Sequence, residues 1–150
     1  MDVQHLSPTQ RILSWREFRT SIKDCSELDQ LNKVVQFWSK APIITYSIDW
    51  DKANSWPSAW ELIHEGNFDT NAIAFLMEQT LIALGWDPER LLLSYIRLKD
   101  NSDQMMILCV DNKYVLNYSW GELYDIDKLR SICISLIKYK WVDDGHIVVA

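Results

Sequence analysis

The sequence predicts a single α+β domain, in which N-terminal helices pack on a small antiparallel sheet. In the first half of the chain, apolar residues recur every three to four positions, as in amphipathic helices. Beyond Pro88 the pattern changes to short apolar runs separated by turn residues, as in antiparallel strands. With 150 residues, 48% of them apolar, the chain can bury one core and leaves little room for a second domain. We therefore treat residues 1–150 as one domain.

The first two helices are predicted from the spacing of aromatic and aliphatic side chains. Residues 1–13 are weakly patterned and are predicted to form an N-terminal arm or a loose start. A short amphipathic helix is predicted over 14–22. Ser26 is a suitable N-cap for a second helix over 28–38, which must stop before Pro42.

Two further helices follow a β-prone run. Residues 43–48 could form an edge strand or an extended connection. A serine with a proline two residues later is a helix-start signal, and glycine is a natural stop, so a helix is predicted from Ser55 to Gly66. Asp69 or Thr70 then caps a long apolar helix that ends at Gly85.

The second half of the chain is predicted to form the sheet. Strands are predicted over 91–98 and 105–110. Asp111-Asn112 is a tight-turn signal, which joins the second of these strands to Lys113–Leu116 in a hairpin. The last predictions are less definite: a helical turn within 123–131, an ambiguous stretch over 132–140 and a final strand over 146–149.

Composition excludes several classes of protein. A net charge of −6 argues against a nucleic-acid binder, which needs clustered Lys and Arg. No run of about 18 apolar residues predicts a membrane span, and the N-terminus lacks the features of a signal peptide. The three cysteines have no CxxC spacing, and the four glycines form no phosphate-binding loop. We therefore expect no cofactor, no metal and synthesis in a reducing cytoplasm.

Three segments resemble a known family. Gly66-Asn67-Phe68-Asp69-Thr70-Asn71-Ala72 opens the long helix, and the runs Met105–Val110 and Tyr114–Asn117 follow in the sheet. Their order and spacing resemble those of the transglutaminase-like cysteine proteinases of the papain-like superfamily, including short virion-associated relatives in tailed phages. The resemblance covers roughly residues 55 to 120 and implies the papain-like core fold.

The resemblance also implies that the catalytic triad has been lost. In the family, a cysteine at the helix start is activated by the helix dipole, a histidine takes its proton and an acid orients the histidine. The matching positions here are Phe68, Met105 and Asn117. Phe68 has no nucleophile and Met105 cannot carry a proton, so the chain is predicted not to be an enzyme.

A relocated triad is the alternative. Cys109 lies in an apolar run, where burial raises a thiol pKa, and His64 lies near a helix end, where its charge suits the dipole. Cys25 lies in a turn between helices with no histidine nearby in the sequence. A metal pairing of His5 with His146 would be guesswork.

The sequence thus favours a non-catalytic structural or assembly protein, and the resemblance implies a tailed-phage virion component, for example of the neck, tail or baseplate. Its partners would be other virion or assembly proteins, in an oligomer or hetero-complex, and its location the virion after synthesis in the host cytoplasm. A peptide- or cell-wall-binding module that keeps the ancestral groove is second, and a hydrolase with a relocated nucleophile third. Six tryptophans near element ends are candidate interface residues: Trp15, Trp50, Trp56, Trp86, Trp120 and Trp141.

Overall fold

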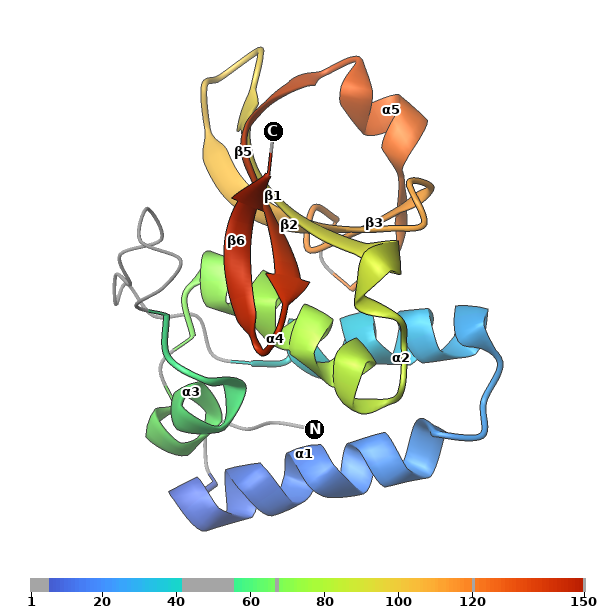
Figure 1. Cartoon of the computed structure of the whole chain (residues 1–150), viewed down its shortest axis with the longest axis vertical. Helices are drawn as coiled ribbons and strands as arrows, with labels where there is room; N and C mark the ends of the chain where they lie inside the picture. Colours follow the sequence, from blue (N-terminus) through green and yellow to red (C-terminus); the bar gives the residue numbers. More distant parts are fainter. Residues whose placement is uncertain (1–5, 42–55, 67, 120, 150) are drawn as a thin grey trace.

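The computed structural model describes residues 6–41, 56–66, 68–119 and 121–149. The described residues form helices and a six-stranded antiparallel sheet, which confirms the predicted α+β class (Figure 1). The helices are α1 (Pro8–Ile22), α2 (Glu27–Ser39), α3 (Ala59–Glu65), α4 (Thr70–Ala83), the 3-10 turn η3 (Pro88–Arg90) and α5 (Ile126–Arg130). The strands are β1 (Leu91–Leu98), β2 (Gln104–Val110), β3 (Tyr114–Leu116), β4 (Tyr124–Asp125), β5 (Cys133–Val142) and β6 (Gly145–Val149).

The prediction of an arm over residues 1–13 is wrong from Pro8 onward. Pro8 begins α1, and Ser7 and Gln10 form a capping box: the Ser7 hydroxyl accepts from the Gln10 amide, and the Gln10 side chain accepts from the Ser7 amide. Proline suits the first helical position because its missing N–H would have no partner there. Residues 1–5 lie outside the described residues.

The next two helix starts follow the same capping chemistry. Ser26 caps α2 as predicted, because its side chain accepts from the Asp29 amide. α3 begins after Ser58, whose side chain accepts from the Glu61 amide, and therefore starts later than predicted. The proposed strand at 43–48 and the proposed start at Ser55 lie outside the described residues.

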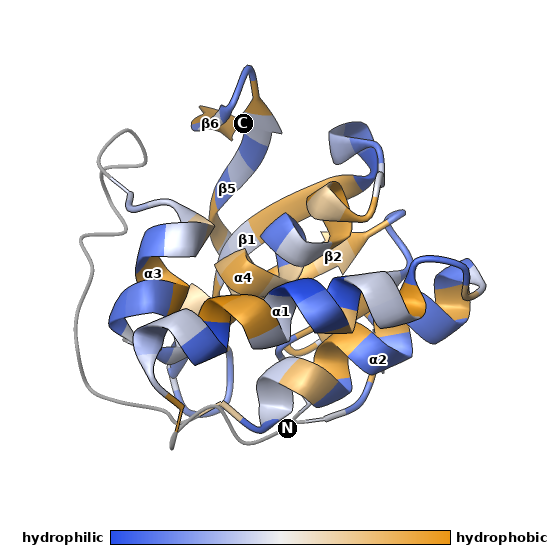
Figure 2. Ribbon diagram, turned by 90° about the horizontal axis from the view of Figure 1, so that it is seen from below, coloured by the Kyte–Doolittle hydropathy of each residue, from blue (hydrophilic) through white to orange (hydrophobic). Residues whose placement is uncertain are grey.

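The core lies between α4 and the sheet. α4 packs against β1 and β2, α2 packs on α4, and α1 packs against α3. Figure 2 shows α4 as a largely hydrophobic ribbon behind the more polar α1 and α2. Thr80 of α4 joins these layers: its hydroxyl accepts from the indole N–H of Trp15 (3.0 Å) and of Trp38 (3.1 Å), and donates to the Leu76 carbonyl.

The sheet has the order β4-β3-β2-β1-β5-β6. Asp111 and Asn112 join β2 to β3 with φ of 55° and 53°, the left-handed pair typical of a type I′ hairpin turn, as predicted. The ambiguous stretch 132–140 belongs mainly to β5, which pairs with β1 on one side and β6 on the other. On the sheet face turned away from α4, α5 covers a second apolar cluster: Ile96, Ile107, Cys109, Val115, Ile126 and Leu129. Among the described residues no helix is both long and apolar enough to cross a membrane.

Candidate functional site

The candidate site is the turn that leads into α4. α3 ends at Gly66, whose φ of 74° is the left-handed conformation that glycine adopts without strain. The guanidinium of Arg11 in α1 donates to the carbonyls of Ile63 (2.8 Å) and His64 (2.5 Å) at the end of α3. These bonds satisfy carbonyls that a helix end leaves without partners. They fix the point from which the chain turns into α4.

Phe68 lies in the core at this turn. Its side chain is 1% exposed, and its ring centroid lies 5.9 Å from that of Trp38. The next residue, Asp69, caps α4, because its carboxylate accepts from the Ala72 amide at 2.6 Å. The helix start thus carries an apolar ring where a nucleophile would need access to solvent.

Two asparagines connect the first turn of α4 to β2. The Asn71 side-chain oxygen accepts from the Met106 amide at 2.9 Å. The Asn117 side-chain nitrogen donates to the carbonyls of Thr70 (2.7 Å) and Met106 (2.9 Å). Asn117 is 5% exposed, and its Oδ1 has no hydrogen-bond partner among the described residues. These contacts bring the helix start, β2 and the residue after β3 together.

Met106, rather than Met105, is the residue of β2 that faces this site. Met106 is fully buried in the core cluster that contains Phe68, whereas Met105 packs against the cluster under α5. Successive side chains of a strand point to opposite faces, so only one of the two can lie beside α4. The structure therefore brings Phe68 and Asn117 together with Met106, and places the side chain of Met105 on the other face.

The cysteines offer no ready replacement nucleophile. Cys109 belongs to the cluster on the far face of the sheet, and burial raises its pKa to about 11. Cys133 packs against the same cluster, and burial also raises its pKa. Cys25 lies between α1 and α2, where its sulfur accepts from the Lys33 ammonium at 3.6 Å. In the part of the chain that the structure describes, no hydrogen bond joins a cysteine to a histidine.

The histidines serve other contacts. His64, at the end of α3, stacks on the exposed ring of Trp60 with centroids 4.9 Å apart. His146 of β6 is buried, and its Nε2 lies 2.6 Å from Oε1 of Glu78, which is fully buried in α4. His5 lies outside the described residues. Sequence reasoning missed the Glu78–His146 pair. Its signal was a single acid within a largely apolar helix.

Of the tryptophans predicted to lie at an interface, two are buried in the core and two are half-buried. Trp15 is 8% exposed, and Trp86 is 6% exposed and donates to the Gln30 side chain at 2.8 Å. These two are core residues and offer no surface to a partner, contrary to the prediction. Trp56 and Trp141 are half-buried, and both rings lie close to that of His146. The remaining candidates, Trp50 and Trp120, lie outside the described residues.

Across the described ranges, no three His, Cys, Asp or Glu side chains come together in a way that could hold a metal ion. Two pairs of acids that lie close together in the sequence have local roles: Asp125 caps α5 by accepting from the Asp127 amide, and Asp143-Asp144 form the β5–β6 turn with φ of 49° and 62°.

The architecture is that of the transglutaminase-like fold, with a helix start facing two antiparallel strands. No protein-family model and no curated protein matches the sequence. The fold is similar to that of LapG from Legionella pneumophila. Against calcium-bound LapG the TM-score is 0.73 at 19% identity, with 99% of this chain and 88% of that chain covered. A second LapG structure gives a TM-score of 0.74 at 20% identity, covering 98% of this chain and 83% of that chain. EGTA-treated LapG gives 0.73 at 20% identity, covering 98% and 81%.

Proposed function

We propose that this chain is a non-catalytic assembly protein on a transglutaminase-like fold. The observation that carries the proposal is the start of α4, where the ring of Phe68 is buried at the position that the resemblance assigns to the nucleophile. A helix start favours a thiolate because its dipole and unpaired amides stabilise negative charge. A phenylalanine gains nothing from that field. It gains from the contact with Trp38, which makes the turn part of the core.

The setting we propose is a tailed-phage virion, in the neck, tail or baseplate, as the sequence resemblance implies. Support for an interaction role comes from the last two strands, β5 and the edge strand β6. Apolar side chains are exposed along them, on both faces: Ile134, Leu136, Val142, Ile147 and Val148. Such exposed apolar side chains can contribute to contact surfaces for other proteins.

An active hydrolase is the rival, because the resemblance is to cysteine proteinases. It requires a cysteine, a histidine and an acid in one open groove. Cys109 and Cys133 lie on the sheet face opposite Phe68, which disfavours this function. A module that binds a ligand in the ancestral groove is also disfavoured, because the side chains at this site are buried and leave no open groove. Phe68 is 1% exposed, Met106 0% and Asn117 5%.

The first test restores the nucleophile alone. We expect Phe68→Cys to show no thiol-dependent hydrolysis, because neither Met106 nor Asn117 can act as a base. Cleavage of a generic peptide substrate should be compared for wild type, Phe68→Cys and each protein after alkylation. Cleavage by Phe68→Cys that alkylation abolishes would refute the alignment. Cleavage by wild type with the same sensitivity would refute the non-catalytic function.

The second test addresses assembly. Size-exclusion chromatography with light scattering should give a mass above that of a single chain. Val148→Lys should lower this mass, because a charge on an outer strand opposes pairing. Mass spectrometry should also detect the chain in particles purified from its native source. A monomer that such particles do not contain would contradict the assembly role.

A further inference from the structure

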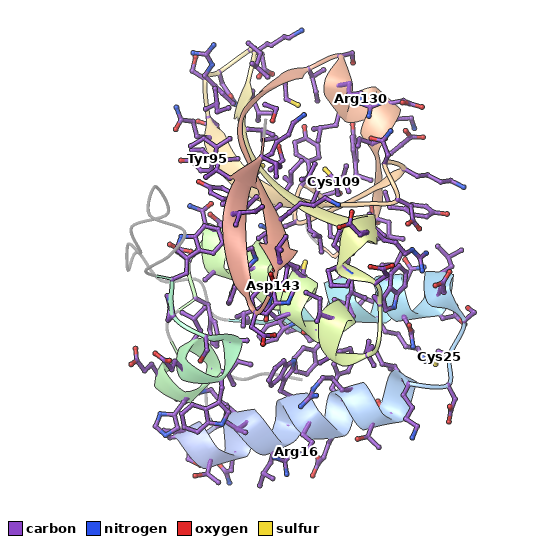
Figure 3. All side chains as sticks on the ribbon, in the orientation of Figure 1. Arg16, Cys25, Tyr95, Cys109, Arg130 and Asp143 are labelled. Atoms are coloured by element: carbon purple, nitrogen blue, oxygen red, sulfur yellow. The ribbon has the colours of Figure 1, made fainter. Side chains whose placement is uncertain are left out.

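A cavity of about 470 Å³ lies at the tip of the β5–β6 hairpin, away from the turn at Phe68. It opens between the start of α3, one side of α4 and the hairpin. Figure 3 shows the hairpin turn, marked by Asp143, lying over α4. The described residues that line the cavity are Trp56, Pro57, Ser58, Ala59, Glu61, Phe75, Gln79, Trp141, Asp144, Gly145 and His146.

Aromatic rings form the walls of this cavity. The ring centroid of His146 lies 4.6 Å from that of Trp56, 5.0 Å from that of Trp141 and 5.4 Å from that of Phe75. Trp141 and His146 are direct cross-strand partners in the β5–β6 pair, so their side chains share one face of the hairpin. The indole rings of Trp56 and Trp141 therefore both lie beside the imidazole ring of His146 in the cavity.

The imidazole of His146 is held in place by a buried acid of α4. Glu78 lies in the core with 0% exposure, and its Oε1 contacts both His146 Nε2 (2.6 Å) and the Gln79 side-chain nitrogen (3.0 Å). The bond between His146 and Glu78 holds the hairpin against α4, so His146 is fixed in the cavity before any ligand enters. A preformed site binds at a lower ordering cost than one that must assemble.

Acidic side chains line the cavity, and its one imidazole, His146, is paired with the buried acid Glu78. Glu61 and Asp144 both line the cavity, and no Lys or Arg occurs among its described lining residues. Aromatic faces attract cations through their negative π surface, and carboxylates nearby add to that attraction. A neutral or anionic ligand would gain nothing from either feature.

We propose that this cavity binds an organic ammonium group, either of a small free cation or of a lysine side chain on a partner protein. The alkyl part of the group would contact Trp56 and Trp141. The positive nitrogen would lie within the field of Glu61 and Asp144. This site needs no catalytic residue, and it does not depend on the assembly role, so each proposal can fail without the other.

The test uses the full chain and a pair of probes that differ only in charge. Choline and its uncharged carbon isostere, 3,3-dimethylbutan-1-ol, should be titrated by NMR and tryptophan fluorescence. We expect choline to bind at least about tenfold more tightly than the isostere. A lysine peptide and the matching norleucine peptide form the second arm. Tighter binding of the lysine peptide than of choline would assign the group to a partner protein, and the reverse order to a free cation.

Two variants locate the binding. Trp141→Ala and Asp144→Asn should each weaken choline binding several-fold, and Asn tolerates the positive φ of this turn position. Trp60→Ala removes an exposed tryptophan that does not line the cavity, and should leave binding unchanged. Equal binding of choline and the isostere would overturn the proposal. Choline binding that neither Trp141→Ala nor Asp144→Asn alters would also overturn it.

Discussion

Asn117 shows how a single amide can join a helix start to a strand. Its side-chain nitrogen donates to two main-chain carbonyls, of Thr70 and Met106, which belong to α4 and β2. A carboxylate at the same place would meet those two oxygens with no proton to donate. The asparagine also adopts a φ of 75°, a conformation that asparagine tolerates better than most residues.

Asn117→Asp, which replaces this amide with a carboxylate, should therefore destabilise the fold. We expect a loss of about 2–4 kcal/mol, from two lost hydrogen bonds and a buried charge without a partner. Urea unfolding at neutral pH measures it. Asn112→Asp is the matched control: φ is 53° there, and the side-chain oxygen accepts from Arg130, so an acid suits the site. Equal losses for the two variants would contradict this account of Asn117.

The sequence does not say which of two adjacent methionines faces α4. The sequence prediction places Met105 at the site, yet Met106 faces α4. Two adjacent methionines have the same chemistry, so no pattern in this strand says which one points inward. Only pairing of the strand settles the face, because a shift of one residue exchanges every side chain between faces.

At the scale of elements, the sequence predicted best where one local signal decides the structure. α4 follows from its apolar run between Asp69 and Gly85, and the β2–β3 hairpin from Asp111-Asn112. The start of α1 was missed, although Ser7 and Gln10 form a capping box, because the apolar pattern before residue 14 is weak. β5 was ambiguous because it is half-exposed, and its pairing with β1 and β6 is a long-range contact.

Thr80 is the clearest link between elements. Its hydroxyl joins α4 to α1 through Trp15 and to α2 through Trp38. Thr80→Val keeps the shape and leaves two buried indole N–H groups unpaired. We expect a loss of about 2–4 kcal/mol in the free energy of unfolding. Thr20→Val, at an exposed position of α1, is the control and should change stability by less than about 0.5 kcal/mol. A loss at Thr80 no larger than this would show that the indoles find other acceptors.

At the scale of the whole molecule, Arg90 ties the helical layer to the sheet. From η3, its guanidinium contacts Glu27 at the start of α2 (2.5 Å) and Asp111 in the β2–β3 turn (2.7 Å). It also lies over the ring of Trp86, 4.2 Å from the centroid. The hydrogen bonds from Arg90 lower the pKa of both Glu27 and Asp111, and raise the pKa of Arg90 itself.

The contacts of Arg90 with Glu27 and Asp111, here called the Arg90 clamp, make the free energy of unfolding depend on pH in the acid range. Both carboxyls have lower pKa values in the folded state than in the unfolded state, so between those values the unfolded chain binds more protons. The stabilisation is therefore fully present above the unfolded pKa values, 4.5 for Glu27 and 3.8 for Asp111, and is lost as pH falls through the folded values. The pairs are exposed, so the effect on stability is modest.

Arg90→Gln should remove this dependence. The difference in unfolding free energy between wild type and Arg90→Gln should be constant above about pH 5 and shrink as pH falls toward 2. A residual difference should remain at low pH, because the contact with Trp86 does not titrate in this range. Urea unfolding at a series of pH values measures both parts. Arg16→Gln makes the same change in net charge at an exposed position of α1 and should show no such trend. A difference for Arg90→Gln that stays constant down to pH 2 would show that the clamp leaves both carboxyl groups unperturbed.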